Sequence, residues 1–294
     1  MTRKAHYNVG GISFQVELEE NSIFWKSLNS YHPFEVMQAP NTHNFSLCTG
    51  KWQDDDNLGR QIVCAYNELK KRHESVWKKE GGYVFDYKYN NPKFSYRLYI
   101  PENGGHSLIS FPKEYNGHRS IDFALNFLYS IFASQNCALI FHASCVIRDG
   151  KAVLFHAPCG TGKSTHSQQW MKAFPDAELL NDDGPIVRVW PDGRVIAYGS
   201  PWSGQTPCYK NLSAPVAAFV RINRASENKI HRLSPVEAYA SLMPSCTGSV
   251  KWNPEITEAQ HQTLEKIISS VPCYQLDCLP NEDAARVCAA EVLK

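Results

Sequence analysis

The segment Ala157-Pro158-Cys159-Gly160-Thr161-Gly162-Lys163-Ser164 comes just after the apolar run Ala152-Val153-Leu154-Phe155 and leads into a predicted helix over residues 163–174. An apolar strand, a glycine-rich turn and a helix in this order are typical of a loop that binds phosphate groups. Small residues in the turn let successive backbone N–H groups point toward an anion. The segment therefore predicts a phosphate-binding loop of the Walker A type.

Each position of this loop has an expected part in binding. Gly160 and Gly162 permit the backbone turns, Lys163 neutralises the outer phosphates, and the Ser164 hydroxyl is a ligand for Mg²⁺. The residues expected to contact the phosphates are Cys159, Gly160, Thr161, Gly162, Lys163, Ser164 and Thr165. Ala157 replaces the first glycine of the usual pattern, which is sterically tolerable if only Gly160 and Gly162 need positive φ.

Composition bounds the class of protein. The chain has 294 residues, of which 43% are hydrophobic and 20% charged, so it can form one large or two unequal folded domains. Lys and Arg total 30 against 29 acidic residues. This balance argues against nucleic acid and membrane surfaces as partners.

Ten cysteines are scattered through the chain without a CxxC pair. Their spacing fits neither a structural zinc site nor a small secreted disulfide scaffold. The N-terminal residues lack an apolar signal core, and no run approaches the length of a membrane span. We therefore expect a cytoplasmic protein.

The first part of the chain alternates apolar and polar residues and is rich in aromatic ones. The alternation over Ile12–Leu18, Gly82–Tyr87 and Phe94–Ile100 predicts half-buried antiparallel strands. We place a boundary near Phe111–Gly117. Residues 1–117 are then a β-rich N-terminal domain with a possible role in recognising a substrate or peptide, and residues 118–294 are a nucleotide-binding domain.

In the second domain strands and helices alternate. The predicted strands cover residues 137–147, 151–155, 177–180, 186–190, 194–198, 217–222 and 273–278, and the predicted helices cover 121–132, 163–174, 235–242, 257–270 and 282–293. Several strands pair as hairpins close to the phosphate-binding loop. The fold class is α/β, with a mixed sheet rather than a doubly wound parallel one.

Polar residues at other strand ends can complete a site around the loop. Asp182 and Asp183 follow a short apolar strand about twenty residues after Lys163, where a carboxylate can hold Mg²⁺ or accept a proton. His142 lies on the strand before the loop and can reach these carboxylates or a metal. Lys210, Arg221 and Arg224 are candidates for binding phosphate.

In order and spacing, His142, the loop Gly160–Ser164 and the pair Asp182-Asp183 resemble the HPr serine kinases and, more distantly, the ATP-dependent phosphoenolpyruvate carboxykinases. The similarity covers residues 138–222 and extends more loosely to the end of the chain. Together with the Gly199-Ser200-Pro201-Trp202 segment and the aromatic N-terminal region, it resembles the HPr-kinase-related proteins of bacterial peptide-modification systems.

This resemblance implies a fold core, ligands and roles. ATP and Mg²⁺ are the implied cofactors. Lys163 would bind the β- and γ-phosphates, Ser164 and Asp183 would hold Mg²⁺, and Asp182 would deprotonate the acceptor hydroxyl. His142 would support the base as in the kinases or join a metal shell as in the carboxykinases. A homo-oligomer is implied as well, although no segment of the sequence marks an interface.

Three functions remain open from the sequence. The first is a kinase that transfers the γ-phosphoryl group of ATP to a hydroxyl, serine in the first instance, of a peptide, protein or small molecule. HPr itself is a doubtful acceptor, because the chain lacks the C-terminal signature with which those kinases contact it. The alternatives are a nucleotide-binding module that recognises peptides without catalysis and a lyase of the carboxykinase type.

Overall fold

A computed structural model describes residues 1–38, 42–51, 58–68, 71–91, 94–102, 105–112, 119–204, 206–247 and 253–294. The chain divides into two compact units, the first formed by Met1–Phe132 with Val250–Asn253 and the second by Ala133–Ser249 with Pro254–Lys294. Most of the boundary segment predicted at Phe111–Gly117 lies outside the described residues. The division falls between Phe132 and Ala133, within the last turn of the helix that follows this segment (Arg119–Ser134).

The first unit is built on an eight-stranded sheet in the order β1-β2-β3-β8-β7-β6-β5-β4. Its elements are β1 (Thr2–Val9), β2 (Ile12–Glu19), η1 (Ile23–Phe34), β3 (Phe45–Thr49), β4 (Arg60–Asn67), β5 (Arg72–Lys79), β6 (Gly82–Tyr89), β7 (Tyr96–Pro101), β8 (His106–Ser110) and α1 (Arg119–Ser134). Most neighbours are antiparallel as the alternating pattern predicts, but β3 is parallel to both β2 and β8. The prediction of antiparallel strands is confirmed for β6 and β7, whereas β2 is antiparallel to β1 only. A parallel pair needs a crossover connection, and η1 lies between β2 and β3 in the chain.

Helix α1 packs on this sheet through aromatic side chains. Phe132 stacks on Phe45 of β3, and Tyr129 meets Phe14 of β2 edge to face. The Tyr129 hydroxyl is buried and donates a hydrogen bond to the Val9 carbonyl. The apolar residues whose spacing predicts the helix therefore lie on the face that packs against the sheet.

The second unit holds a nine-stranded sheet with the order β12-β10-β11-β15-β14-β13-β9, to which β17 and β16 are added beside β15. Its strands are β9 (Ala138–Ile140), β10 (Ala143–Arg148), β11 (Lys151–His156), β12 (Glu178–Asp183), β13 (Ile186–Val189), β14 (Val195–Tyr198), β15 (Ser213–Arg224), β16 (Lys229–Arg232) and β17 (Cys273–Cys278). Its helices are α2 (Lys163–Ala173), α3 (Pro235–Leu242), η4 (Met243–Ser245), α4 (Pro254–Ser270) and α5 (Glu282–Val292). The prediction of a mixed α/β sheet is confirmed.

The strand predicted over residues 137–147 is divided into β9 and β10. Strand β9 pairs with β13, whereas β10 pairs with β11 and β12. Strand β9 ends before Phe141. The Phe141 N–H donates to the Pro185 carbonyl, and the His142 N–H donates to the Ser245 carbonyl. This break places His142 just before β10 instead of within a continuous strand.

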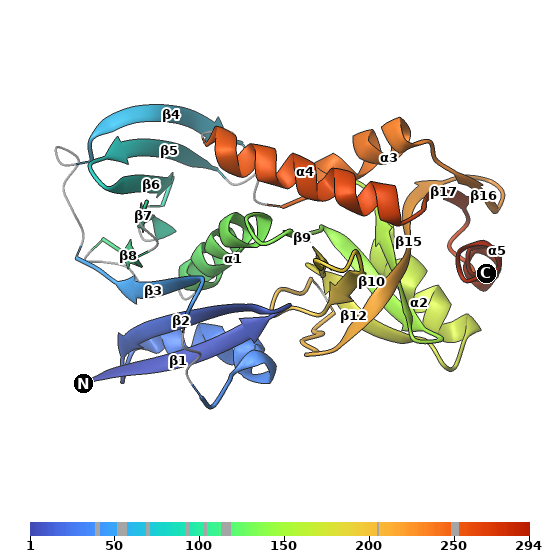
Figure 1. Cartoon of the computed structure of the whole chain (residues 1–294), viewed down its shortest axis with the longest axis horizontal. Coiled ribbons are helices and arrows are strands. Elements are labelled where there is room, and N and C mark those ends of the chain that lie inside the picture. Colours follow the sequence, from blue (N-terminus) through green and yellow to red (C-terminus); the bar gives the residue numbers. More distant parts are fainter. Residues whose placement is uncertain are drawn as a thin grey trace. The chain divides into compact units, whose positions relative to one another are not determined.

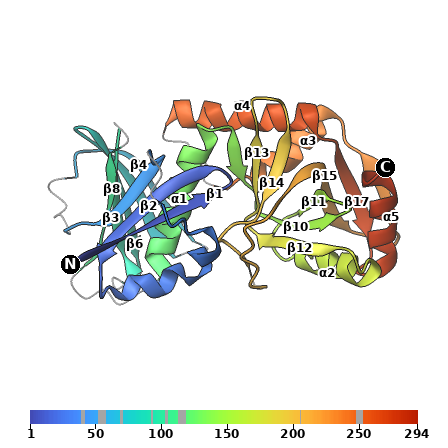
Figure 2. The same ribbon diagram turned by 60° about the horizontal axis from the view of Figure 1, so that its bottom comes forward.

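The sheet of the second unit is covered on both faces, as Figures 1 and 2 show. Along β11, Val153 and Phe155 join a buried cluster with residues of α2 and α5, while Ala152 and Leu154 join another with residues of α3 and α4. Because side chains alternate along a strand, one short apolar run supplies both cores. The loop after β11 is thereby anchored from two sides. Among the described helices, none is long and apolar enough to cross a membrane.

Candidate functional site

The loop between β11 and α2 has the conformation that its glycines predict. Gly160 has φ +77° and Gly162 has φ +120°, values that side-chain-bearing residues rarely adopt. Gly162 is the N-cap of α2, and no side chain caps this helix end. The first N–H groups of α2 therefore remain available to an anion, which the helix dipole also favours.

Ala157 is accommodated because it belongs to the protein core. It is buried at the end of β11 in the same cluster as Phe155 and Trp170, so its methyl group packs where glycine would leave a gap. Its carbonyl accepts a hydrogen bond of 3.2 Å from the ammonium of Lys163. Alanine at position 157 is thus compatible with the positive φ angles of Gly160 and Gly162.

Lys163, His142 and Asp183 lie together beside the loop. The Lys163 Nζ is 3.1 Å from His142 Nε2, and His142 Nε2 is also 3.2 Å from Asp183 Oδ1. Lys163 is largely buried, and this burial lowers the pKa of its ammonium group, with the nearby Asp183 carboxylate opposing the shift. Three groups predicted separately from the sequence thus meet around one point.

The two aspartates differ sharply in their surroundings. Both lie in β12 rather than after it, opposite Ser144 and Ala143 of β10. The side chain of Asp183 is 49% exposed, whereas Asp182 is only 3% exposed. The Oδ2 atom of Asp182 has no hydrogen-bond partner. Since a buried carboxylate oxygen without a donor is costly, Asp182 is suited to a cation.

The segment after β14 is hydrogen-bonded to β12. Gly204 donates its N–H to the Asp182 carbonyl at 2.6 Å, and a side chain at Gly204 would meet that carbonyl at 2.7 Å. Asn181 donates through its side-chain amide to the carbonyl and hydroxyl oxygens of Ser200. Ser200 and Gly204 therefore both hold β12 in place.

Two side chains of the candidate site carry oxygen atoms of the kind that magnesium takes as ligands. Magnesium is commonly held by one or two carboxylates together with phosphate oxygens and water. The unpaired Asp182 oxygen and the Ser164 hydroxyl at the start of α2 are donors of this kind. In the part of the chain that the structure describes, no three His, Cys, Asp or Glu side chains form a metal cluster by themselves.

The three candidate cations for phosphate have different partners. Arg224 donates from Nη2 to the Gly160 carbonyl at 2.6 Å and from Nε to the Thr161 carbonyl at 2.9 Å. Lys210 donates to the Glu178 carboxylate. Arg221 is exposed at the end of the parallel pairing between β11 and β15, opposite His156. Arg224 thus holds the loop backbone itself.

Two further side chains near the loop were missed from the sequence. His156 directly precedes Ala157, is buried at 2%, and has no hydrogen-bond partner at Nε2. Burial, with the positive charges of Arg221 and Lys163, lowers the pKa of His156 to about 3, so it is neutral at pH 7. His166 is also buried, and burial lowers its pKa to about 4. A polar residue at the junction of strand and loop was the available signal for His156.

The remaining candidate residues are exposed or half-buried. Cys159 and Thr165 are exposed, while Thr161 and Ser164 are half-buried. All ten cysteines lie in the described part of the chain, and all are free thiols.

Comparisons with known proteins give one family and a distant structural likeness. A family model described as "SynChlorMet cassette protein ScmC" matches residues 119–279. No curated protein matches the chain. Among solved structures, the HPr(Ser) kinase/phosphatase from Coxiella burnetii is similar over 52% of this chain and 88% of its own, with 10% identity and a TM-score of 0.31. A TM-score of this size is too low to assign a fold core or an activity.

Proposed function

The chain belongs to the family of SynChlorMet cassette proteins ScmC, and we propose that it is an ATP-dependent kinase that phosphorylates a hydroxyl group of a peptide, protein or small molecule. The observation that carries this proposal is the meeting of Lys163, His142 and Asp183 beside the loop. Phosphoryl transfer needs positioned phosphates, neutralised charge and a base for the attacking hydroxyl. These residues can supply all three.

In the proposed reaction the acceptor oxygen forms a bond to the γ-phosphorus while the bond to the bridging oxygen of ADP breaks. The acceptor proton passes to a carboxylate of the chain, and ADP leaves with the bridging oxygen. Lys163 and the N–H groups at the start of α2 stabilise the charge on the phosphates. When bound, magnesium would neutralise further charge on the same oxygens.

The different burial of the two aspartates supports roles opposite to those inferred from the sequence, where Asp182 was the base and Asp183 a Mg²⁺ ligand. We propose Asp183 as the base, because it is half-exposed where an acceptor can approach and is paired with His142. Asp182, with its buried unpaired oxygen, and Ser164 are the proposed magnesium ligands. His142 then supports the base, which is one of the two roles that the sequence left open.

The two contacts of His142 indicate how nucleotide binding would prepare the catalytic base. His142 Nε2 faces both Lys163 and Asp183, and a single ring nitrogen offers either a lone pair or a proton. When phosphates draw the lysine toward the loop, Nε2 becomes free to donate to Asp183. The base would thereby be oriented only after the phosphoryl donor has bound.

The test is transfer of radioactive phosphate from [γ-³²P]ATP to an array of hydroxyl-containing peptides, with magnesium and the full chain. We expect labelling by the natural chain and a loss of about a hundredfold or more for Asp183→Asn, with ATP affinity unchanged. Asp192→Asn, which alters an exposed turn carboxylate, is the matched control. Equal labelling by Asp183→Asn would refute this base, whereas tight ATP binding without any labelling would favour a non-catalytic module.

A further inference from the structure

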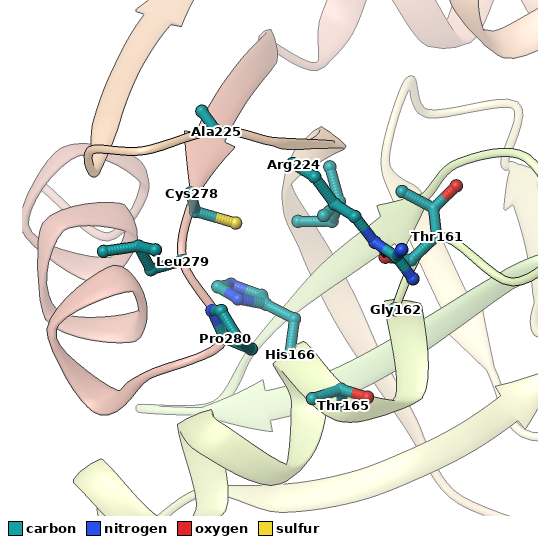
Figure 3. Close-up of a pocket in the computed structure, with 10 residues that line it drawn as sticks. Thr161, Gly162, Thr165, His166, Arg224, Ala225, Cys278, Leu279 and Pro280 are labelled. Carbon is teal, nitrogen blue, oxygen red and sulfur yellow. Dashed lines mark hydrogen bonds between the residues drawn. The ribbon is translucent and has the colours of Figure 1, made fainter.

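A cavity of about 300 Å³ lies beside the loop. Figure 3 shows the residues that line it. Its walls come from the loop and α2, from the end of β15 and from the residues that follow β17. The lining residues are Thr161, Gly162, Thr165, His166, Ile222, Arg224, Ala225, Cys278, Leu279 and Pro280. Neither the proposed base nor the proposed magnesium ligands are among them.

The strand order explains why the cavity and the aspartates lie on opposite sides. Strand β11 has β10 and then β12 on one side, and β15 and then β17 on the other. Because β15 and β17 run parallel to β11, their carboxyl ends reach the same edge of the sheet as the loop. Ligands of α/β sheets bind at this edge. A molecule held by the loop can therefore extend in both directions.

Arg224 forms the wall of the cavity nearest the loop. Its two hydrogen bonds to the Gly160 and Thr161 carbonyls fix the guanidinium group beside Thr161, as Figure 3 shows. A guanidinium group held in this way presents a flat face on which an aromatic ring can stack. Across the cavity, the Cys278 sulfur points toward the same space.

His166 provides a polar group in an otherwise mainly apolar part of the wall. Its Nε2 accepts a hydrogen bond of 3.1 Å from the Trp170 indole, so the proton of the neutral ring is on Nδ1. The ring projects from α2 toward Cys278 and Pro280 (Figure 3). The wall therefore combines apolar surface with a hydrogen-bond donor of fixed position.

From this geometry we infer that the cavity binds the nucleoside part of the triphosphate. The nucleobase stacks on Arg224 and packs against Ile222 and Cys278. His166 donates a hydrogen bond from Nδ1 to one acceptor atom of the nucleobase. The phosphates run from the cavity along the loop toward Lys163, so that the γ-phosphate reaches Asp183. The inference rests on the proposed function and adds to it where the nucleoside lies and which residues recognise it.

Binding of ATP and of inorganic tripolyphosphate to the full chain, measured by calorimetry, separates this inference from the proposed function. We expect ATP to bind at least about tenfold more tightly than tripolyphosphate, because only ATP fills the cavity. Cys278→Phe should remove this difference and leave tripolyphosphate affinity within about twofold, which also shows that the variant is folded. Cys64→Phe, at an exposed cysteine of β4, is the matched control.

A second measurement needs no variant. Photolabelling of the natural chain with 8-azido-ATP should place the label on residues 222–225 or 278–280. Label elsewhere, equal affinities for the two ligands, or an undiminished preference for ATP in Cys278→Phe would overturn the inference. If the natural chain binds neither ligand, the proposed function itself fails and the inference fails with it.

Discussion

The ammonium of Lys163 lies 3.1 Å from Nε2 of His142, although 21 positions separate the two residues in the chain. The break between β9 and β10 makes this contact possible, because it places His142 beside the strand that delivers the loop. The lysine also donates to the Ala157 carbonyl, so its charge is directed inward before any phosphate binds. The loop lysine, its histidine neighbour and the exposed aspartate therefore form one linked group.

Replacement of Lys163 by methionine should weaken binding of both ATP and tripolyphosphate at least about tenfold, because a charge-assisted hydrogen bond to phosphate is lost. Calorimetry on the two ligands measures the effect. Lys172→Met, at an exposed lysine of the same helix, should bind both ligands as the natural chain does. Unchanged tripolyphosphate affinity in Lys163→Met would show that the loop is not the phosphate site.

Replacement of His142 by alanine should lower the rate of transfer about 10- to 100-fold while ATP affinity changes little, because Asp183 loses the group that orients it. Glutamine places a nitrogen donor close to the position of Nε2, so His142→Gln should recover part of the rate. Single-turnover labelling with saturating ATP is the measurement. Equal rates for the alanine and glutamine variants would contradict an orienting role.

Replacement of Asp182 by asparagine should raise the magnesium concentration needed for half-maximal ATP binding about tenfold, because a carboxylate is a far better magnesium ligand than an amide. Asp183→Asn should leave this concentration nearly unchanged. Titration of magnesium at fixed ATP distinguishes the two aspartates. The opposite pattern would restore the assignment that the sequence suggested, with Asp183 on the metal.

Replacement of Arg224 by alanine should loosen the loop, because the Gly160 and Thr161 carbonyls lose their donors. We expect faster amide hydrogen exchange over residues 159–162 and an ATP affinity lower by about tenfold. Arg194→Ala, which removes an arginine paired with Asp192 in an exposed turn, serves for comparison. Exchange that stays slow in Arg224→Ala would mean that the loop is rigid without this arginine.

Stability should fall as the pH is lowered through the range in which an unfolded histidine becomes charged. Burial and neighbouring positive charges keep the pKa of His156 at about 3, far below its value in the unfolded chain. Between these two values the unfolded chain binds the additional proton, so the free energy of unfolding rises with pH there and decreases on acidification. The expected loss from this residue between pH 7 and pH 5 is about 2 kcal/mol.

Urea unfolding of the natural chain and of His156→Leu at both pH values measures this contribution. Leucine has no proton to bind, so the variant should lose about 2 kcal/mol less stability than the natural chain over this interval. An identical pH dependence of the two proteins would show that His156 is not buried as a neutral ring.

Local sequence patterns were enough to place most elements of the second unit. The Asp149-Gly150 turn joins β10 to β11 with positive φ at both residues, as a two-residue hairpin requires. Asn281 caps α5 by accepting from the Ala284 N–H. The strand over residues 273–278 and the helix over 235–242 have the predicted bounds. In these cases neighbouring residues alone determine the structure.

Features that depend on distant residues were harder to predict. The break at Phe141 depends on pairing with β13, more than forty positions later, and the parallel entry of β3 depends on η1 and β8. Adjacent residues of a strand face opposite sides of the sheet, so Asp182 and Asp183 have different surroundings. Which of the two is buried depends on tertiary packing. The sequence therefore indicated residues that the fold brings together, Lys163, His142 and Asp183, but not the different burial of the two aspartates.

The placement of the loop strand β11 between two independent pairs of neighbours has a consequence for divergence among relatives. Under the proposed function, substitutions at the ends of β15 and β17 would change the preferred phosphoryl donor while β12 keeps Asp182 and Asp183 unaltered. Under the same proposal, substitutions around β12 would select a new acceptor without disturbing donor recognition. Such a layout would let the two specificities change independently of each other during evolution.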